Sequence, residues 1–143
     1  MRLVDLVALA YGNVVAAVEA AIWCGFWRRF SPPAREPEQP RDDAYHLALT
    51  AAYFAPFLPL MLLGALSPLD VVRGATMVWL LNDVLWHFYA VHPADWLKWL
   101  KFYFNPLDDR AVWYARFGFA TAKVSPRRML IATVIRLAFL AVT

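Results

Sequence analysis

The sequence contains few of the residues from which catalytic and metal centres are commonly built. Among its 143 residues there are one cysteine and three histidines, and only 17% are Asp, Glu, Lys or Arg. The single cysteine, Cys24, excludes an intramolecular disulfide and any metal or iron–sulfur centre that needs several cysteines of this sequence. No G-x-S-x-G, phosphate-loop or H-E-x-x-H motif occurs, so nothing points to the enzyme classes that those motifs mark.

The composition is instead dominated by apolar residues. Hydrophobic residues make up 62% of the chain, aromatic residues 16%, and the mean hydropathy is +0.47, which is far above that of an ordinary soluble domain. The net charge of +3 does not indicate a nucleic-acid partner, because the basic residues lie beside apolar segments, as in juxtamembrane loops. We therefore expect an all-α integral membrane protein that forms a single membrane domain over residues 1–143.

Four apolar runs predict three or four transmembrane helices of about 20 residues each. The runs cover residues 3–27, 44–63, 68–90 and 129–143. The first is interrupted by Asp5, Asn13 and Glu19 and is too long for a typical cleaved signal peptide, so we interpret it as a retained helix. The fourth has only 15 residues, and its length leaves open whether it spans the membrane.

Local signals indicate a kink and a helix start. Pro56 and Pro59 remove backbone donors from the second run, so we expect a kink in its outer half. Ser67 as N-cap, Pro68 at the first helical position and Asp70 three residues after the cap together predict a helix that begins at Pro68.

Two polar stretches separate the longer runs. Residues 31–43 contain four prolines and many charges, so we expect a solvated loop there. Residues 94–119 are too charged to span a membrane, but Lys98 and Lys101 stand among aromatic residues. This mixture favours an amphipathic helix that lies at the membrane interface.

The positive charges predict an orientation. Of the 14 Lys and Arg residues, 11 fall in the loop after the first run or in the long connection before the fourth. If every run spans, both loops lie on the same side. The positive-inside rule then puts the basic loops and the interfacial helix in the cytoplasm and the N-terminus outside.

Small and ionisable residues recur at helical spacing within these runs. Glu19 shares one face of the first helix with a stripe of small residues that permits close helix packing, namely Ala8, Gly12, Ala16 and Ala20. Asp83 and His87 share a face of the third helix. Because ionisable groups at membrane depth usually have partners, we expect a buried polar network of Glu19, Asp83, His87 and Arg136, with Arg136 pairing with one of the carboxylates.

Three alternatives assign chemistry to these residues. Asp83, His87, His46 and Glu19 would supply carboxylate and imidazole ligands to a metal ion that acts on a lipid-like substrate. His87 or His92 would serve as an axial ligand to haem or a pigment. A relay through Glu19, Asp83 and His87 would move protons or ions.

The function that we expect from the sequence is that of a small accessory subunit of a larger multi-subunit membrane complex. The small-residue stripe is longer than a self-contained bundle needs, and aromatic residues are abundant for contact with lipid or with other membrane subunits. The alternative is a membrane-embedded protein that binds a metal or cofactor through the residues named above.

Overall fold

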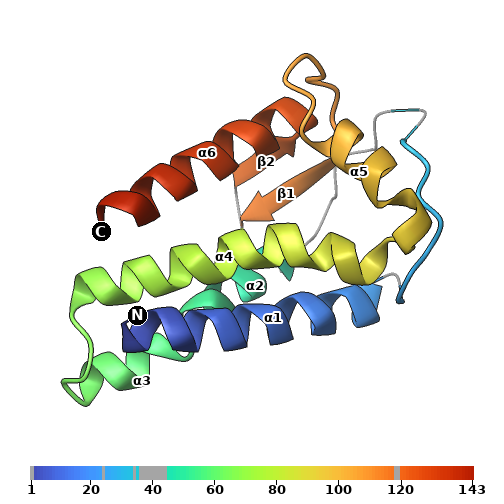
Figure 1. The fold of residues 1–143 in the computed structure, drawn as a ribbon. Helices are drawn as coiled ribbons and strands as arrows, with labels where there is room; N and C mark the ends of the chain where they lie inside the picture. The colour runs from blue at the N-terminus through green and yellow to red at the C-terminus, as the bar shows by residue number, and fades with distance from the viewer. Residues whose placement is uncertain (1, 24, 34, 36–44, 118–119) are drawn as a thin grey trace.

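The computed structural model describes residues 2–23, 25–33, 35, 45–117 and 120–143, and this part of the chain is mostly helical (Figure 1). Its elements, in chain order, are α1 (Leu3–Trp23), α2 (Tyr45–Phe54), α3 (Phe57–Leu62), α4 (Pro68–Ala90), a short 3₁₀ helix η1 (Pro93–Asp95), α5 (Trp96–Tyr103), β1 (Trp113–Phe117), β2 (Ala120–Val124) and α6 (Pro126–Val142). Most of the expected Pro-rich loop, including residues 36–43, lies outside the described residues.

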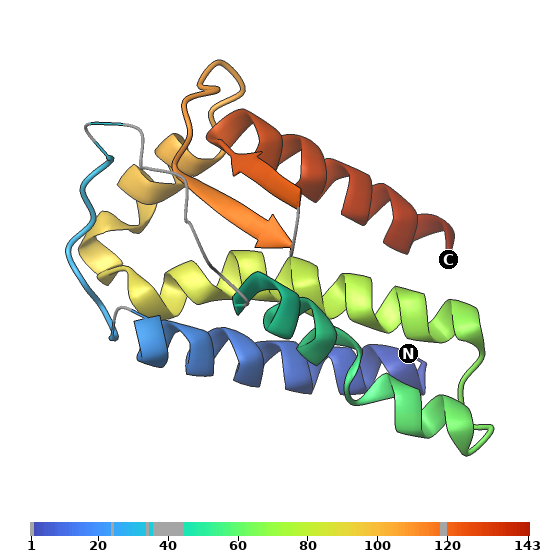
Figure 2. The same ribbon diagram turned by 180° about the vertical axis from the view of Figure 1, so that it is seen from behind.

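Helices α1 and α4 lie side by side and run in the same direction, whereas α6 runs the opposite way (Figure 1; Figure 2). At the start of both helices, Val4 packs closely against Gly74, and at the other end the Trp27 amide donates to the carbonyl of Tyr89 at 2.9 Å. The two ends of the described chain therefore lie at one end of the bundle. The loop after α1 and the segment between α4 and α6 lie at the other.

The small-residue stripe of α1 forms its contact with α4. Ala8, Ala16 and Ala20 are completely buried, and a Cβ added to Gly12 would lie 3.0 Å from the Cβ of Leu81. Small side chains bring the two backbones close enough for long side chains of one helix to fill the grooves of the other. The largest apolar cluster surrounds this contact and includes Phe57 of α3.

The predicted start of α4 is confirmed in detail. The Ser67 hydroxyl accepts a hydrogen bond from the Asp70 amide, and the Asp70 carboxylate accepts one from the Ser67 amide at 3.0 Å, which completes a capping box. A second serine and proline pair, Ser125 and Pro126, starts α6, where the Ser125 hydroxyl accepts a hydrogen bond from the Arg128 amide but no capping box forms. The fourth helix therefore begins three residues before the predicted residue 129.

The first two apolar runs are interrupted where the backbone cannot continue a helix. Gly25 has a φ of +72°, a left-handed conformation that suits glycine, and Trp27 has a φ of +54°, so the chain bends after α1 and does not reach residue 27 as helix. Pro56 separates α2 from α3, so the proline-rich run is divided into two short helices at the expected kink.

The prediction of an all-α fold is wrong for the end of the 94–119 segment. Helix α5 ends at Tyr103, and β1 and β2 then pair antiparallel, with Trp113 opposite Val124 and Tyr114 opposite Lys123. Aromatic and β-branched residues favour a strand over a short helix at these positions, and antiparallel pairing satisfies the backbone polar groups. The end of β1 lies near α2 (Figure 2), and Trp113 of β1 and Val124 of β2 pack against an apolar cluster that includes Met129 of α6.

A polar clamp joins the loop after α1 to the end of α4. Asp95 accepts hydrogen bonds from Arg29 Nε at 2.7 Å, from Arg29 Nη2 at 3.1 Å and from the Phe30 amide at 3.1 Å. An isolated parallel bridge between Arg28 and Val91 lies beside it. These contacts hold together segments that are more than 60 residues apart in the chain.

Within the part of the chain that the structure describes, two helical segments are long and apolar enough to cross a membrane, Leu3–Ile22 of α1 and Tyr45–Leu62 across α2 and α3. Only 28% of the first segment and 11% of the second is buried within the chain. Both segments therefore present most of their surface outwards.

Gly74→Ala should destabilise the bundle by about 1–3 kcal/mol, although alanine favours a helix more than glycine does. The added methyl group would lie 2.6 Å from the Phe57 ring and 2.8 Å from Val4. Thermal unfolding in detergent measures the effect, and Phe57→Leu in the same chain should restore part of the loss. If Gly74→Ala alone raises the unfolding temperature, α3 does not pack against α4 as described.

Asp95 and Asp108 should make the fold sensitive to low pH. Both lie at the end of the bundle opposite the two ends of the described chain, which we call the basic end because most lysines and arginines of the sequence lie in its connections. Hydrogen bonds from Arg29 hold the pKa of Asp95 below its usual range, and those from Arg110 lower the pKa of Asp108 to about 2. A depressed folded-state pKa stabilises the fold above the unfolded-state value of about 3.9, and this contribution is lost as the pH falls through the folded-state pKa. We expect the unfolding temperature to drop between about pH 4 and pH 2, and to drop less in Asp95→Asn, which is less stable at neutral pH. An identical pH profile in Asp95→Asn would contradict the clamp.

Candidate functional site

An ion pair in the middle of the bundle joins α6 to α4. Arg136 Nη1 lies 2.5 Å from Asp83 Oδ2, and the Arg136 side chain is only 7% exposed. The guanidinium carbon also lies 4.3 Å from the centre of the Trp79 ring, a cation–π contact. The carboxylate and the ring both come from α4. They neutralise and cover a charge that would otherwise be costly in apolar surroundings.

A second polar cluster joins α1, α2 and α4. Asn82 Nδ2 donates to Glu19 Oε2 at 2.6 Å and contacts the Tyr53 hydroxyl at 3.1 Å, and the Tyr45 hydroxyl donates to Glu19 Oε1. Each helix supplies at least one member, so the cluster determines how α2 is placed against the other two. Asn82 is 3% exposed, and its Oδ1 atom has no partner among the described residues.

Two consecutive residues of α4, Asn82 and Asp83, therefore contact different neighbouring helices. Side chains of adjacent helical residues point about 100° apart, so Asn82 reaches α1 and α2 while Asp83 reaches α6. The sequence pattern predicts a polar network that contains Glu19, Asp83 and Arg136, but it does not indicate a role for Asn82, Tyr45 or Tyr53. The sequence feature that pointed to Asn82 was its position next to Asp83. A polar side chain on a different face of the same helix can hydrogen-bond to a different neighbouring helix.

His87 lies apart from both clusters. Its Nδ1 atom is 2.8 Å from the carbonyl oxygen of Asp83, and its ring stacks on Trp99 with the ring centres 3.9 Å apart. Tyr103 covers it from a second direction at 4.4 Å. Among the described residues, His87 has no hydrogen bond to the side chains of Glu19, Asp83 or Arg136, and its contact with Asp83 is to the backbone carbonyl. Its main role here is to anchor α5 to α4.

The other two histidines occupy different environments. The His92 ring accepts a hydrogen bond from the Ala94 amide at 3.2 Å and caps η1, while the His46 ring lies against Tyr45 at 5.0 Å. No group of three or more His, Cys, Asp or Glu side chains that could hold a metal ion occurs within the described parts of the chain. The structure thus does not assemble the candidate ligands Asp83, His87, His46 and Glu19 into one set.

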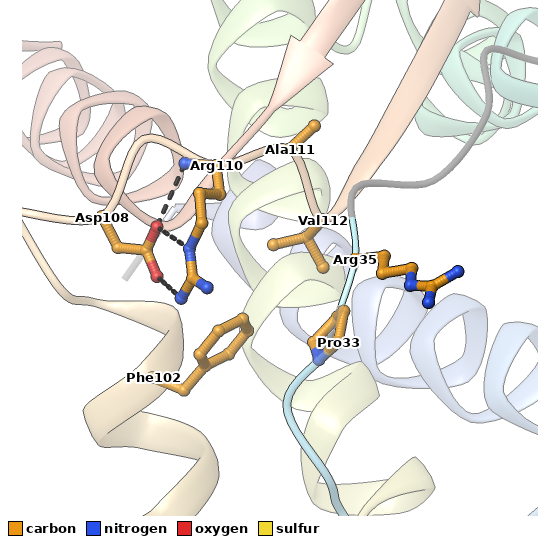
Figure 3. Close-up of a pocket in the computed structure, with 7 residues that line it drawn as sticks. All are labelled: Pro33, Arg35, Phe102, Asp108, Arg110, Ala111 and Val112. Atoms are coloured by element: carbon orange, nitrogen blue, oxygen red, sulfur yellow. Dashed lines mark hydrogen bonds and ion pairs between the residues drawn. The ribbon is translucent and has the colours of Figure 1, made fainter.

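A small cavity lies at the basic end of the molecule, between α5 and the loop that precedes β1 (Figure 3). Its volume of about 30 Å³ suits one or two water molecules rather than an organic ligand. Asp108 holds Arg110 beside it through contacts of 3.0 Å to Nε and 2.6 Å to Nη2. The cavity is lined by Pro33, Arg35, Phe102, Asp108, Arg110, Ala111 and Val112.

Comparison of the chain with protein-family models, curated proteins and solved structures finds no match.

Arg136→Leu should destabilise the protein by about 3–5 kcal/mol, because Asp83 would keep a buried charge without a partner. Asp83→Asn in the same chain should recover much of that loss, while Glu19→Gln should not, since Glu19 bonds to Asn82 and Tyr45 instead. Unfolding temperatures of the single and double variants measure the coupling. Equal rescue by both carboxylate substitutions would show that the two clusters share one electrostatic site.

Proposed function

We propose that this chain is an integral membrane protein of three or four spans that acts as a small accessory subunit of a larger membrane complex. Its basic loops lie in the cytoplasm and its N-terminus lies outside. Helices α1, α4 and α6 and the α2–α3 segment form the membrane bundle, and α5 closes its cytoplasmic end.

The exposed apolar faces of α1 and α6 carry the proposal. Both helices bury one side against α4 and present large hydrophobic side chains on the other, over their full length. Exposed residues of this kind on α1 are Leu3, Leu6, Leu9, Val14, Val18 and Ile22, and those on α6 are Ile131, Val134, Ile135, Leu137 and Val142. Continuous apolar surfaces of this length fit lipid or other membrane helices, whereas in water they would drive aggregation.

The arrangement of the helices supports the proposed orientation. The parallel course of α1 and α4 and the opposite course of α6 bring both basic connections to the same end of the bundle (Figure 1). The alternation of membrane crossings requires this placement if all four segments span. The positive-inside rule then assigns that end to the cytoplasm.

The use of the buried polar groups favours a structural role. Asp83 with Arg136, and Glu19 with Asn82, join helices to one another. Polar contacts of this kind are common where membrane helices associate. The buried polar residues thus hold the helices of the bundle together, and the outer apolar faces are open to partners.

One observation favours the cofactor alternative. A carbonyl oxygen only accepts hydrogen bonds, so the contact with Asp83 O requires the proton of a neutral His87 to be on Nδ1. The Nε2 lone pair is then suited to a metal or haem iron.

Extraction and native mass spectrometry test the function. We expect the protein to remain with the membrane after washing at alkaline pH, and to leave it in mild detergent as part of a larger complex of different subunits. Arg136→Leu should reduce the recovered complex more than an exposed, lipid-facing change such as Val134→Leu. A soluble monomer after the alkaline wash would refute the membrane assignment, and a homo-oligomer that carries a haem or metal mass would favour the His87 alternative.

A further inference from the structure

Helix α5 turns its aromatic face towards the protein and its basic face outwards. Trp99 is 1% exposed and Tyr103 3%, and both pack on His87 of α4. The outer face carries Lys98 and Lys101, with Leu97 beside them at 73% exposure. An amphipathic helix held by lipid would show the opposite arrangement, with its aromatic residues in the bilayer.

The loop after α1 brings another cation to the same surface. Lys98 Nζ donates to the carbonyl of Phe30 at 2.9 Å, and the neighbouring Arg29 holds Asp95 through Nε and Nη2. The Asp95 side chain is 8% exposed but that of Arg29 is 74% exposed, so the outer part of the guanidinium remains accessible. Two cations, Arg29 and Lys98, thus lie near one buried carboxylate. Lys101 follows one helical turn after Lys98 on the exposed side of α5, so this surface has a net positive charge.

Exposed aromatic residues adjoin this surface. Phe26 and Trp27, at 55% and 60% exposure, directly precede Arg28 and Arg29, at the end where the apolar face of α1 stops. Large aromatic side chains next to lysine and arginine are typical of the boundary between the bilayer core and the headgroups. A phosphate group at that boundary would meet the cations of Arg29, Lys98 and Lys101, while its lipid chains continued along α1.

We propose that Arg29, Lys98 and Lys101 form a binding surface for the phosphate headgroup of an anionic phospholipid. The inference rests on the proposed membrane function and adds a specific lipid partner to it. The charge of the surface selects an anion, and the exposed apolar residues Leu97 and Trp27 select a lipid over a soluble polyanion, which would leave them in water.

The test uses the full chain in nanodiscs that contain equal amounts of phosphatidylcholine and phosphatidylglycerol. Native mass spectrometry after ejection reports which lipids stay bound. We expect the wild-type protein to retain phosphatidylglycerol preferentially. The double variant Lys98→Gln with Lys101→Gln should weaken that retention on the order of 25-fold, because each basic residue near a headgroup strengthens binding about fivefold.

A second double variant, Lys123→Gln with Arg127→Gln, is the matched control. Like the α5 variant, it removes two positive charges from the basic end of the molecule, but these charges lie near Asp109 and not on α5. It should keep the preference for phosphatidylglycerol. If both double variants lost phosphatidylglycerol retention equally, the effect would come from net charge alone and the proposal would be overturned. Unchanged retention in the α5 variant would overturn it as well.

Two further arms separate the remaining outcomes. Inorganic phosphate added to the nanodiscs should not displace the lipid, and complete displacement by phosphate would show that the surface recognises a free anion instead. Insertion into nanodiscs of phosphatidylcholine alone tests the proposed function by itself. If the protein inserts there but shows no lipid preference, the lipid inference fails and the membrane assignment stands.

Discussion

The close contact between α1 and α4 determines where the other elements lie. Ala8, Gly12, Ala16 and Ala20 allow the two helices to run side by side in the same direction. Because they are parallel, the chain must return between them, and the α2–α3 segment makes that return. The loops that leave α1 and α4 consequently emerge at the same end, where Asp95 joins them through Arg29.

Polar contacts add specificity to this packing. Close apolar packing brings the helices together but tolerates small rotations of a helix about its axis. A buried ion pair tolerates very little rotation, because it would separate the charge from its partner. The pair of Asp83 and Arg136 therefore sets the position of α6, and the cluster of Glu19 and Asn82 sets that of α2. Since Asn82 and Asp83 are neighbours, a single rotation of α4 about its axis would disrupt both contacts.

The basic end of the molecule combines tight packing with an open, charged surface. His87 is covered by Trp99 and Tyr103, so α5 is attached to α4 by aromatic stacking and not by its charges. This attachment leaves Lys98 and Lys101 available on the outside. An aromatic segment that composition alone assigns to the membrane interface thus belongs to the protein core on one side and faces the headgroup region, as we propose, on the other.

The sequence by itself determined the local features of this protein. Ser67, Pro68 and Asp70 place the start of α4, Pro56 divides the second apolar run, and the spacing of small residues identifies the packing face of α1. Each of these follows from interactions between residues a few positions apart. The same local reasoning applied to Ser125 and Pro126 would have placed the start of α6 correctly.

Only the tertiary structure decided which polar groups meet. From the sequence, Arg136 had two possible carboxylate partners, and His87 was expected to join them. The choice of Asp83, the pairing of Glu19 with Asn82 and the burial of His87 under α5 depend on the rotation and offset of whole helices. Those are set by the sum of many weak contacts between distant segments, which no local pattern contains.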